Sequence, residues 1–146
     1  MLFRNCAGGV VFYANKVLIL KNEKNEWVLP KGVIRNDELP WNKAKERVKI
    51  EAGIDAEVIS TAGRTSYEFF SITRNKPVCN KITWYIMTSS SKDYALNERL
   101  EFKDVGFYSV DEAIKMITYS QDKSLVNLSY KKYKEIMKEK SIANVV

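Results

Sequence analysis

The chain has 146 residues, a net charge of +6 and a hydrophobic content of 45%, which predicts one globular domain over residues 1–146. It has no histidine, and this excludes Ser-His-Asp triads, Cys-His dyads and histidine-containing zinc sites. It also lacks the G-x-x-x-x-G-K-[ST] and G-x-G-x-x-G phosphate loops. Its longest apolar run, residues 7–14, is too short to cross a bilayer, so no membrane partner is expected.

Location and partners follow from the cysteines and the charge distribution. The N-terminal residues show no signal-peptide pattern, and Cys6 and Cys79 lie in strand-like segments, which favours buried thiols in a reducing, cytoplasmic location over a disulfide. Residues 121–146 hold 6 basic and 3 acidic side chains, half of the net charge. The excess favours anionic ligands in general, but it is too terminal to indicate a dedicated nucleic-acid surface; a solvated helix face explains it.

The first elements in chain order are short strands. Residues 6–13 form a mostly buried apolar run whose two glycines allow another backbone or a ligand to come close. A turn separates this run from a second one, which predicts a hairpin. A third strand is ended by Pro30, and a loop follows. The predicted segments are strands 6–13, 17–20 and 27–29 and a loop over 31–38.

A helix is predicted from about Pro40 to Ala52. Proline in the first turn and Gly53 after the last turn are the expected boundary residues. Four apolar residues fall within an arc of about 80° at 100° per residue, so this face should pack on the sheet. They are Trp41, Ala44, Val48 and Ala52.

The second half predicts long strands and two more helices. Residues 54–73 and 81–88 read as strands joined by a turn at 74–77, and a polar loop covers 89–97. A strand at 105–108 leads into a helix at 111–117, capped by Ser109 or Asp111. The last helix, 124–138, turns its apolar residues inward; these are Leu125, Leu128, Tyr133, Ile136 and Met137. The whole predicts an α/β fold, a mixed sheet with helices on both faces.

The most specific pattern runs from residue 32 to residue 54. Its members are Gly32, Glu38, Val48, Glu51, Gly53 and Ile54. The segment resembles the Nudix box, G-x5-E-x7-R-E-U-x-E-E-x-G-U with U aliphatic, and the 21-residue step between its glycines matches without a gap. Downstream, Glu101 and residues 105–113 resemble the last strand and following helix of that family. The resemblance covers roughly residues 5–130.

The resemblance implies a fold, a reaction and a cofactor. Nudix hydrolases cleave nucleoside diphosphates linked to another moiety, and this chain is most similar to members that act on diadenosine polyphosphates. The implied fold is a Nudix-type α/β/α sandwich with a mixed β-sheet. Glutamates on one face of the box helix would hold Mg²⁺ or Mn²⁺, which prefer oxygen ligands, and the ligand would be a nucleoside polyphosphate. Homodimers are common in the family.

The chain departs from the box at its metal ligands. The family places glutamates at positions 47, 50 and 51, whereas this chain has Arg47 and Ile50 and keeps only Glu51. Glu46 is no replacement, because five residues turn its side chain about 140° away from Glu51. A guanidinium about 4 Å from a divalent cation is repelled by about 8 kcal/mol at an effective dielectric of 20. Arg47 and a metal ion therefore cannot share one place.

Two functions stay open from the sequence. In the first, the chain is a weak or altered hydrolase in which Glu51 and Glu101 are catalytic and hold Mg²⁺ or Mn²⁺, Glu38 or Glu98 adds a ligand and Lys31 orients phosphate. Few carboxylates suffice for Mg²⁺ when phosphate oxygens share it. In the second, it is an inactive nucleotide-binding or regulatory module in which Arg47, with Lys31 and Lys49, replaces the metal.

Other residues are candidates for substrate binding or for structure. Lys31, Gly32, Arg47, Arg64 and Tyr85 are predicted to bind substrate. Further aromatic residues could stack on a base, although core packing is the simpler interpretation; they are Tyr67, Phe69, Phe70 and Trp84. Glu38 is expected to brace its loop. Its carboxylate would lie near Glu46 and would then need Arg47 or Lys31 to turn toward them.

Overall fold

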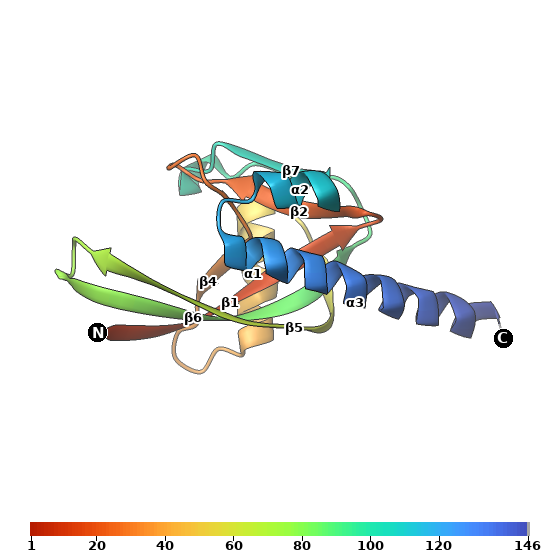
Figure 1. Ribbon diagram of the computed structural model, residues 1–146, viewed down its shortest axis with the longest axis horizontal. Coiled ribbons are helices and arrows are strands. Elements are labelled where there is room, and N and C mark those ends of the chain that lie inside the picture. Colours follow the sequence, from red (N-terminus) through yellow and green to blue (C-terminus); the bar gives the residue numbers. More distant parts are fainter. Residues whose placement is uncertain (146) are drawn as a thin grey trace.

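The structure, a computed structural model, describes residues 1–145 and is built on one mixed sheet (Figure 1). The strand order is β3-β2-β1-β6-β5, with β4 paired to β1 and β7 paired to β2. The strands are β1 (Leu2–Tyr13), β2 (Lys16–Lys21), β3 (Trp27–Val28), β4 (Lys31–Val33), β5 (Ala56–Ser71), β6 (Lys76–Ser89) and β7 (Asp104–Ser109).

Strand β1 is the centre of the sheet. It pairs in parallel with β6 along almost its whole length and antiparallel with β2 and β4. At Gly8 a Cβ atom would lie only 2.4 Å from the ring of Trp84 and 2.6 Å from the carbonyl oxygen of Pro30. Glycine is therefore required there because an indole ring and a neighbouring backbone both press on the strand. The sequence expectation of a close approach at this strand is confirmed.

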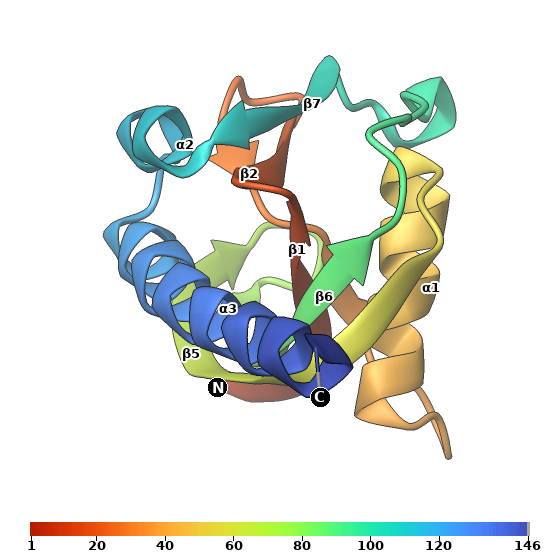
Figure 2. The same cartoon turned by 90° about the vertical axis from the view of Figure 1, so that its right-hand side faces the viewer.

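The helices cover opposite faces of the sheet. Helix α1 (Pro40–Ala52) lies on one face, and α2 (Val110–Met116) and α3 (Ser120–Val145) lie on the other (Figure 2). Side chains alternate along β1 and therefore contribute to two hydrophobic cores. Val10 packs toward α2 and α3, whereas Val11 packs toward α1. This arrangement confirms the predicted mixed sheet between helical layers.

Several predicted boundaries differ from the structure. Residues 31–33 were expected in a loop but form β4, because they pair with residues 6–8 of β1. Strand β6 begins at Lys76 rather than at residue 81, since its first residues pair with the start of β1. Helix α3 begins at Ser120, four residues before its predicted start. Pairing across the sheet, which a local pattern does not contain, sets the two strand boundaries.

Two residues predicted to pack inward are exposed. Trp41, in the first turn of α1, is 43% exposed, and Leu128 of α3 is 63% exposed. On α1 the buried apolar face starts only at Ala44. The predictions for both residues were wrong because helical periodicity places a residue on a face but does not tell how far the sheet beneath it extends.

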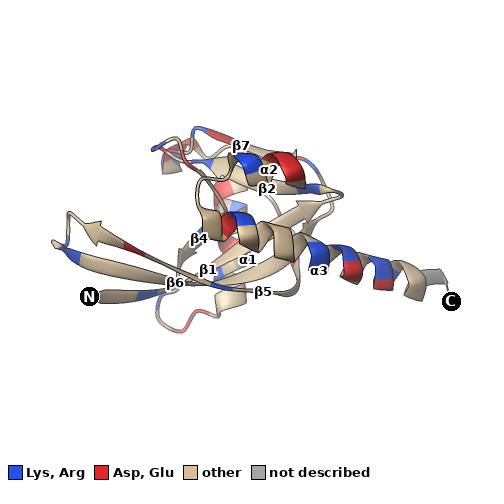
Figure 3. Ribbon diagram, in the orientation of Figure 1, with Lys and Arg blue, Asp and Glu red and all other residues tan. Residues whose placement is uncertain are grey.

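Other expectations agree with the structure at the two cysteines and at the start of α2. Cys6 and Cys79 are buried free thiols, and burial raises the pKa of Cys6. Ser109 caps α2 by accepting the backbone N–H of Glu112. Lysines and glutamates alternate along the projecting part of α3 (Figure 3), which fits a solvated helix face. Within residues 1–145, none of the helices has the length and apolarity needed to span a bilayer.

Candidate functional site

The site centres on an ion pair between α1 and the sheet. The Nε of Arg47 donates a hydrogen bond to Oε2 of Glu51, one helical turn further on, at 2.9 Å. The backbone N–H of Lys31 in β4 donates to the same carboxylate. Gly32 lets the stem of Arg47 lie against β4, because a Cβ there would come within 2.6 Å of its Cδ. Thus β4 and α1 hold Arg47 and Glu51 in one fixed arrangement.

Burial dominates the electrostatics of this pair. Glu51 is 2% exposed, and burial raises its pKa to about 7, although the Arg47 guanidinium, the Lys31 ammonium and the Lys31 N–H oppose the rise. Desolvation disfavours a charged carboxylate unless it is paired and hydrogen-bonded. Above neutral pH the Glu51 carboxylate is therefore ionised against the guanidinium of Arg47, which supplies its positive counter-charge.

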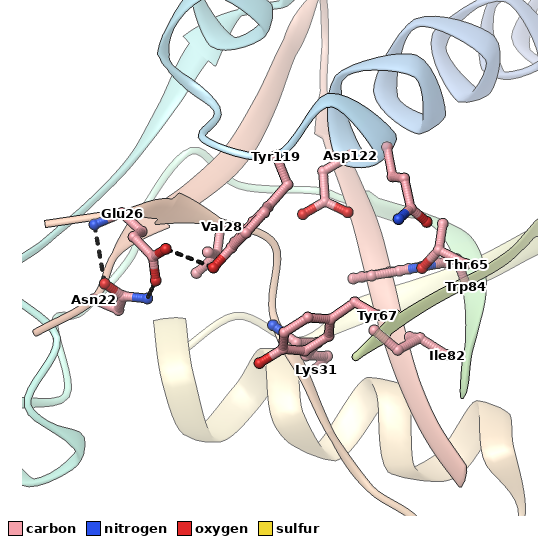
Figure 4. A pocket seen from close by; sticks show the side chains of 11 residues that line it. Asn22, Glu26, Val28, Lys31, Thr65, Tyr67, Ile82, Trp84, Tyr119 and Asp122 are labelled. Atoms are coloured by element: carbon pink, nitrogen blue, oxygen red, sulfur yellow. Dashed lines mark hydrogen bonds between the residues drawn. The ribbon is translucent and has the colours of Figure 1, made fainter. Parts of the chain in front are cut away.

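A pocket of about 80 Å³ adjoins the pair. The backbone of Lys31 contacts Glu51, while its side chain lines the pocket (Figure 4), so this residue joins the two places. The walls come from the β2–β3 region, from β5 and β6 and from the start of α3. The other lining residues are Asn22, Glu26, Val28, Thr65, Tyr67, Ile82, Trp84, Tyr119, Gln121 and Asp122.

Most polar groups around this pocket already have protein partners. The Tyr119 hydroxyl donates to Glu26 at 2.5 Å, and the amide of Asn22 donates to the other oxygen of Glu26 at 3.0 Å. The first of these bonds lowers the pKa of Glu26 and raises that of Tyr119. The indole N–H of Trp84 donates to the Thr65 hydroxyl at 2.8 Å. These bonds fix the walls of the pocket.

The predicted site residues divide into two groups. Lys31, Gly32, Arg47 and Glu51 are brought together. Glu101 is exposed, and the neighbouring carboxyl group of Glu23 raises the pKa of Glu101. Glu51 is buried, and within the described residues no group of three possible metal ligands brings it together with Glu101. The pairing of these two glutamates in one metal site therefore gains no support from the geometry.

The other candidates are not among the residues that line this pocket. Arg64 is exposed on β5 beside a hollow under α3. Tyr85 packs against the core on the α1 side, whereas its neighbour Trp84 lines the pocket on the other face. Lys49 pairs with the exposed Asp55 at 3.0 Å. Ile50 is 37% exposed, as expected for an apolar residue outside the core stripe.

The two glutamates expected to lie near each other are braced by a different cation. Lys43, 8% exposed, forms ion pairs with Glu38 at 2.9 Å and with Glu46 at 3.1 Å. The expectation that Arg47 or Lys31 would turn toward these carboxylates was wrong. One turn of helix places Lys43 between them, so Arg47 remains free to pair with Glu51.

Sequence reasoning missed the far wall of the pocket. Tyr119 and Asp122 lie just before and within the first turn of α3, and the predicted start at residue 124 excluded both. A Ser-x-Asp at the helix start was the available signal, since acidic residues favour the first turn. Glu26 and Asn22 stand in a short turn region that carries no motif.

Comparison with known proteins identifies the family. The NUDIX domain profile matches residues 2–128, most of the chain. The chain belongs to the Nudix family. Among solved structures, an Ap4A hydrolase from C. elegans matches with a TM-score of 0.64 at 22% identity, covering 86% of this chain and 93% of that one.

Two bacterial Nudix-fold enzymes are also similar. The E. coli dihydroneopterin triphosphate pyrophosphohydrolase has a TM-score of 0.69 at 15% identity, covering 86% of this chain and 95% of the other. An ADP-ribose pyrophosphatase from Streptococcus suis has a TM-score of 0.67 at 17% identity, covering 89% and 91%. At these identities the similarity shows the Nudix fold, with substrates that differ among its members.

The divalent metal that Nudix hydrolases generally use does not fit the residues of this site. Of positions 47, 50 and 51, only 51 carries a carboxylate, and the guanidinium of Arg47 already contacts it. The side chain of Ile50 offers no ligand atom, and Glu101 is an exposed residue beside Glu23. Across residues 1–145, no three acidic, cysteine or histidine side chains gather as a metal site would require.

Gly32→Ala should disturb the Arg47–Glu51 pair specifically. The added methyl group would overlap the Arg47 stem, whose Cδ and Cγ lie 2.6 and 2.7 Å from its position. We expect a loss of about 1–3 kcal/mol of unfolding free energy, the usual effect of overpacking. Urea denaturation measures this loss. The control is the same substitution in an Arg47→Ala background, which lacks the stem that the methyl group would overlap; equal losses in both backgrounds would contradict the stated cause.

Proposed function

We propose that this Nudix chain is a binding module for nucleoside di- or polyphosphates in which Arg47 takes the place of the divalent cation. Little phosphohydrolase turnover is expected of it. The observation that carries the proposal is the 2.9 Å contact between Arg47 and Glu51. It puts a permanent cation against the buried carboxylate of the box helix, and a guanidinium can neutralise phosphate oxygens without a metal.

Arg47 retains donors for an anion. Its Nε is engaged by Glu51, whereas no further hydrogen bond of this guanidinium is found within the part of the chain that the structure describes. The side chain is 26% exposed, so its terminal nitrogens can reach a ligand. Charge-assisted hydrogen bonds from arginine to phosphate are short and directional. The side chain of Lys31, which lines the adjoining pocket, adds a second positive charge.

The class of ligand follows from the surroundings of Arg47. The adjoining pocket has aromatic walls at Tyr67, Trp84 and Tyr119, which suit a flat base. The similar solved structures bear names of enzymes that act on Ap4A, ADP-ribose and dihydroneopterin triphosphate. Phosphate chains attached to a ring system are common to these compounds. We therefore propose a nucleoside polyphosphate, including dinucleoside polyphosphates, as the ligand.

The deciding experiment compares nucleotide binding with and without metal. We expect ADP, ATP and diadenosine tetraphosphate to bind equally well in EDTA and in Mg²⁺, measured by calorimetry and by thermal shift. Arg47→Gln should weaken binding at least tenfold, about 1.4 kcal/mol. Arg74→Gln, in the exposed β5–β6 turn, changes the net charge equally and should have no effect.

A hydrolase would give a different result. If binding requires Mg²⁺, and if diadenosine tetraphosphate is turned over at a rate that Glu51→Gln abolishes, the proposal fails. The weak hydrolase, with Glu51 acting through Mg²⁺ or Mn²⁺ and Lys31 orienting phosphate, then replaces it. A cytoplasmic location and a homodimer stay predictions; sedimentation at several concentrations tests the second.

A further inference from the structure

One carboxylate in the pocket has no partner. Asp122 is partly buried in the first turn of α3, and its side chain points into the cavity between Tyr119 and Thr65 (Figure 4). Within the described residues, no hydrogen bond or ion pair involves its carboxylate. The other acidic residue of the pocket, Glu26, is bound by Tyr119 and Asn22. Of the two acidic side chains that line this pocket, Asp122 is thus the one left to accept hydrogen bonds from a ligand.

The surroundings of Asp122 call for hydrogen-bond donors. Burial raises the pKa of this carboxyl group, and the positive charge of Lys31 opposes the rise. Its place in the first turn of a helix also favours the ionised form. An ionised carboxylate is an acceptor with two oxygens, and leaving it without donors in a partly buried pocket is unfavourable.

We infer that the pocket binds a guanine base, with the Asp122 carboxylate accepting the N1–H and the 2-amino group. This inference rests on the proposed nucleotide-binding function. Guanine has two adjacent N–H donors on one edge, which match the two oxygens of a carboxylate. Adenine and cytosine instead present an amino group beside an acceptor nitrogen, and uracil has one N–H between two carbonyl groups. A carboxylate therefore discriminates in favour of guanine among these bases.

The position of Asp122 fits a nucleotide that reaches from base to phosphate. Lys31 faces Asp122 across the pocket, and its backbone N–H contacts Glu51, the partner of Arg47. The rings of Tyr67 and Trp84 form the sides and can contact the faces of a base. A guanine edge at Asp122 thus leaves the phosphates to extend past Lys31 toward Arg47.

The test uses four ligands with the full chain in EDTA: GTP, ITP, ATP and tripolyphosphate. We expect GTP to bind at least tenfold more tightly than ITP, which lacks only the 2-amino group, and than ATP. Asp122→Asn replaces one acceptor by an amide donor, which suits the amino group and N1 of adenine. This variant should reverse the preference between GTP and ATP. The control is Asp111→Asn, an exposed aspartate in the first turn of α2, which should leave the preference unchanged.

The outcomes separate this inference from the proposed function. If the three nucleotides bind equally and Arg47→Gln weakens them all, the guanine assignment is wrong and the phosphate site stands. If GTP is preferred but Arg47→Gln changes nothing, the role of Arg47 is wrong. Equal affinities of GTP and ITP for the unaltered chain refute the guanine assignment even if Asp122→Asn does not fold.

Discussion

The double variant Arg47→Glu/Ile50→Glu is expected to bind Mn²⁺ at least tenfold more tightly than the unaltered chain. In the present structure the guanidinium of Arg47 lies 2.9 Å from Glu51, where a divalent ion would have to bind. On α1, residue 50 lies about 60° from residue 47 around the helix axis, and residue 51 about 40° on the other side. Three carboxylates would then share one helical surface, which suits a hard cation.

This variant also makes a prediction about stability. Without metal, a carboxylate at position 47 repels the buried Glu51, so the melting temperature in EDTA should fall below that of the unaltered chain. Mn²⁺ should raise it again, because a ligand that binds only the folded state stabilises it. Calorimetric titration with Mn²⁺ and melting curves measure both effects. Turnover of diadenosine tetraphosphate should rise with metal affinity.

A charge-matched control separates a metal site from simple electrostatics. Asn127→Glu/Lys134→Glu changes the net charge by the same −3 as the double variant and uses exposed positions of α3 that do not form a group of three carboxylates at i, i+3 and i+4. It should gain no Mn²⁺ site. If both double variants gain similar affinity, general attraction explains the result. If neither gains any, positions 47, 50 and 51 do not form the surface that the resemblance to the Nudix box implies.

The sequence predicted the framework of the site because that framework is local. Pro40 and Gly53 set the bounds of α1, and the spacing of Arg47 and Glu51 placed them one helical turn apart. The departure of Arg47 and Ile50 from the box pattern was visible from the residues alone. What the spacing could not tell was that the guanidinium would contact Glu51 rather than Glu38, since that choice depends on Lys43 and on the backbone of β4.

The pocket could not be predicted because its parts meet only in the folded chain. Asp122 and Tyr119 reach the pocket from the start of α3, whereas Trp84 reaches it from β6. Neither segment contains a sequence pattern that predicts its proximity to the other. Tyr85, the predicted neighbour, points to the opposite face. Alternation along a strand assigns Trp84 and Tyr85 to different faces, but only the sheet order tells which face borders the site.

We expect the free energy of unfolding to depend on pH through the Arg47–Glu51 pair, and we expect Arg47→Met to alter this dependence. The pKa of Glu51 rises from 4.5 to about 7 on folding, so the folded state holds the extra proton between these values. Unfolding free energy therefore falls by about 3 kcal/mol as pH increases from about 4.5 to about 7. Without Arg47 the carboxylate loses its nearest cation, and its pKa should rise further.

The loss of unfolding free energy caused by Arg47→Met is therefore expected to be small at pH 5 and large at pH 8. At pH 5 Glu51 is protonated in both folded proteins, and the loss of one hydrogen bond costs about 1 kcal/mol. At pH 8 the folded variant must either keep the buried Glu51 carboxylate ionised without its cation or bind a proton to it, and the loss should reach about 3 kcal/mol. Urea denaturation at the two pH values measures the difference. Lys49→Met, which breaks the exposed pair with Asp55, should change stability by less than about 1 kcal/mol at either pH.

A second substitution tests whether the lost stability belongs to the pair. Glu51→Gln keeps an oxygen that can accept the Lys31 N–H but removes the charge. Added to Arg47→Met, it should therefore restore most of the unfolding free energy that Arg47→Met alone loses at pH 8. The four proteins form a double-mutant cycle whose coupling energy should be larger at pH 8 than at pH 5. A coupling energy that is the same at both pH values would mean that Arg47 contributes packing against Gly32 alone. Its guanidinium would then not be the counter-charge of Glu51, and the case for Arg47 in the place of a metal ion would fail.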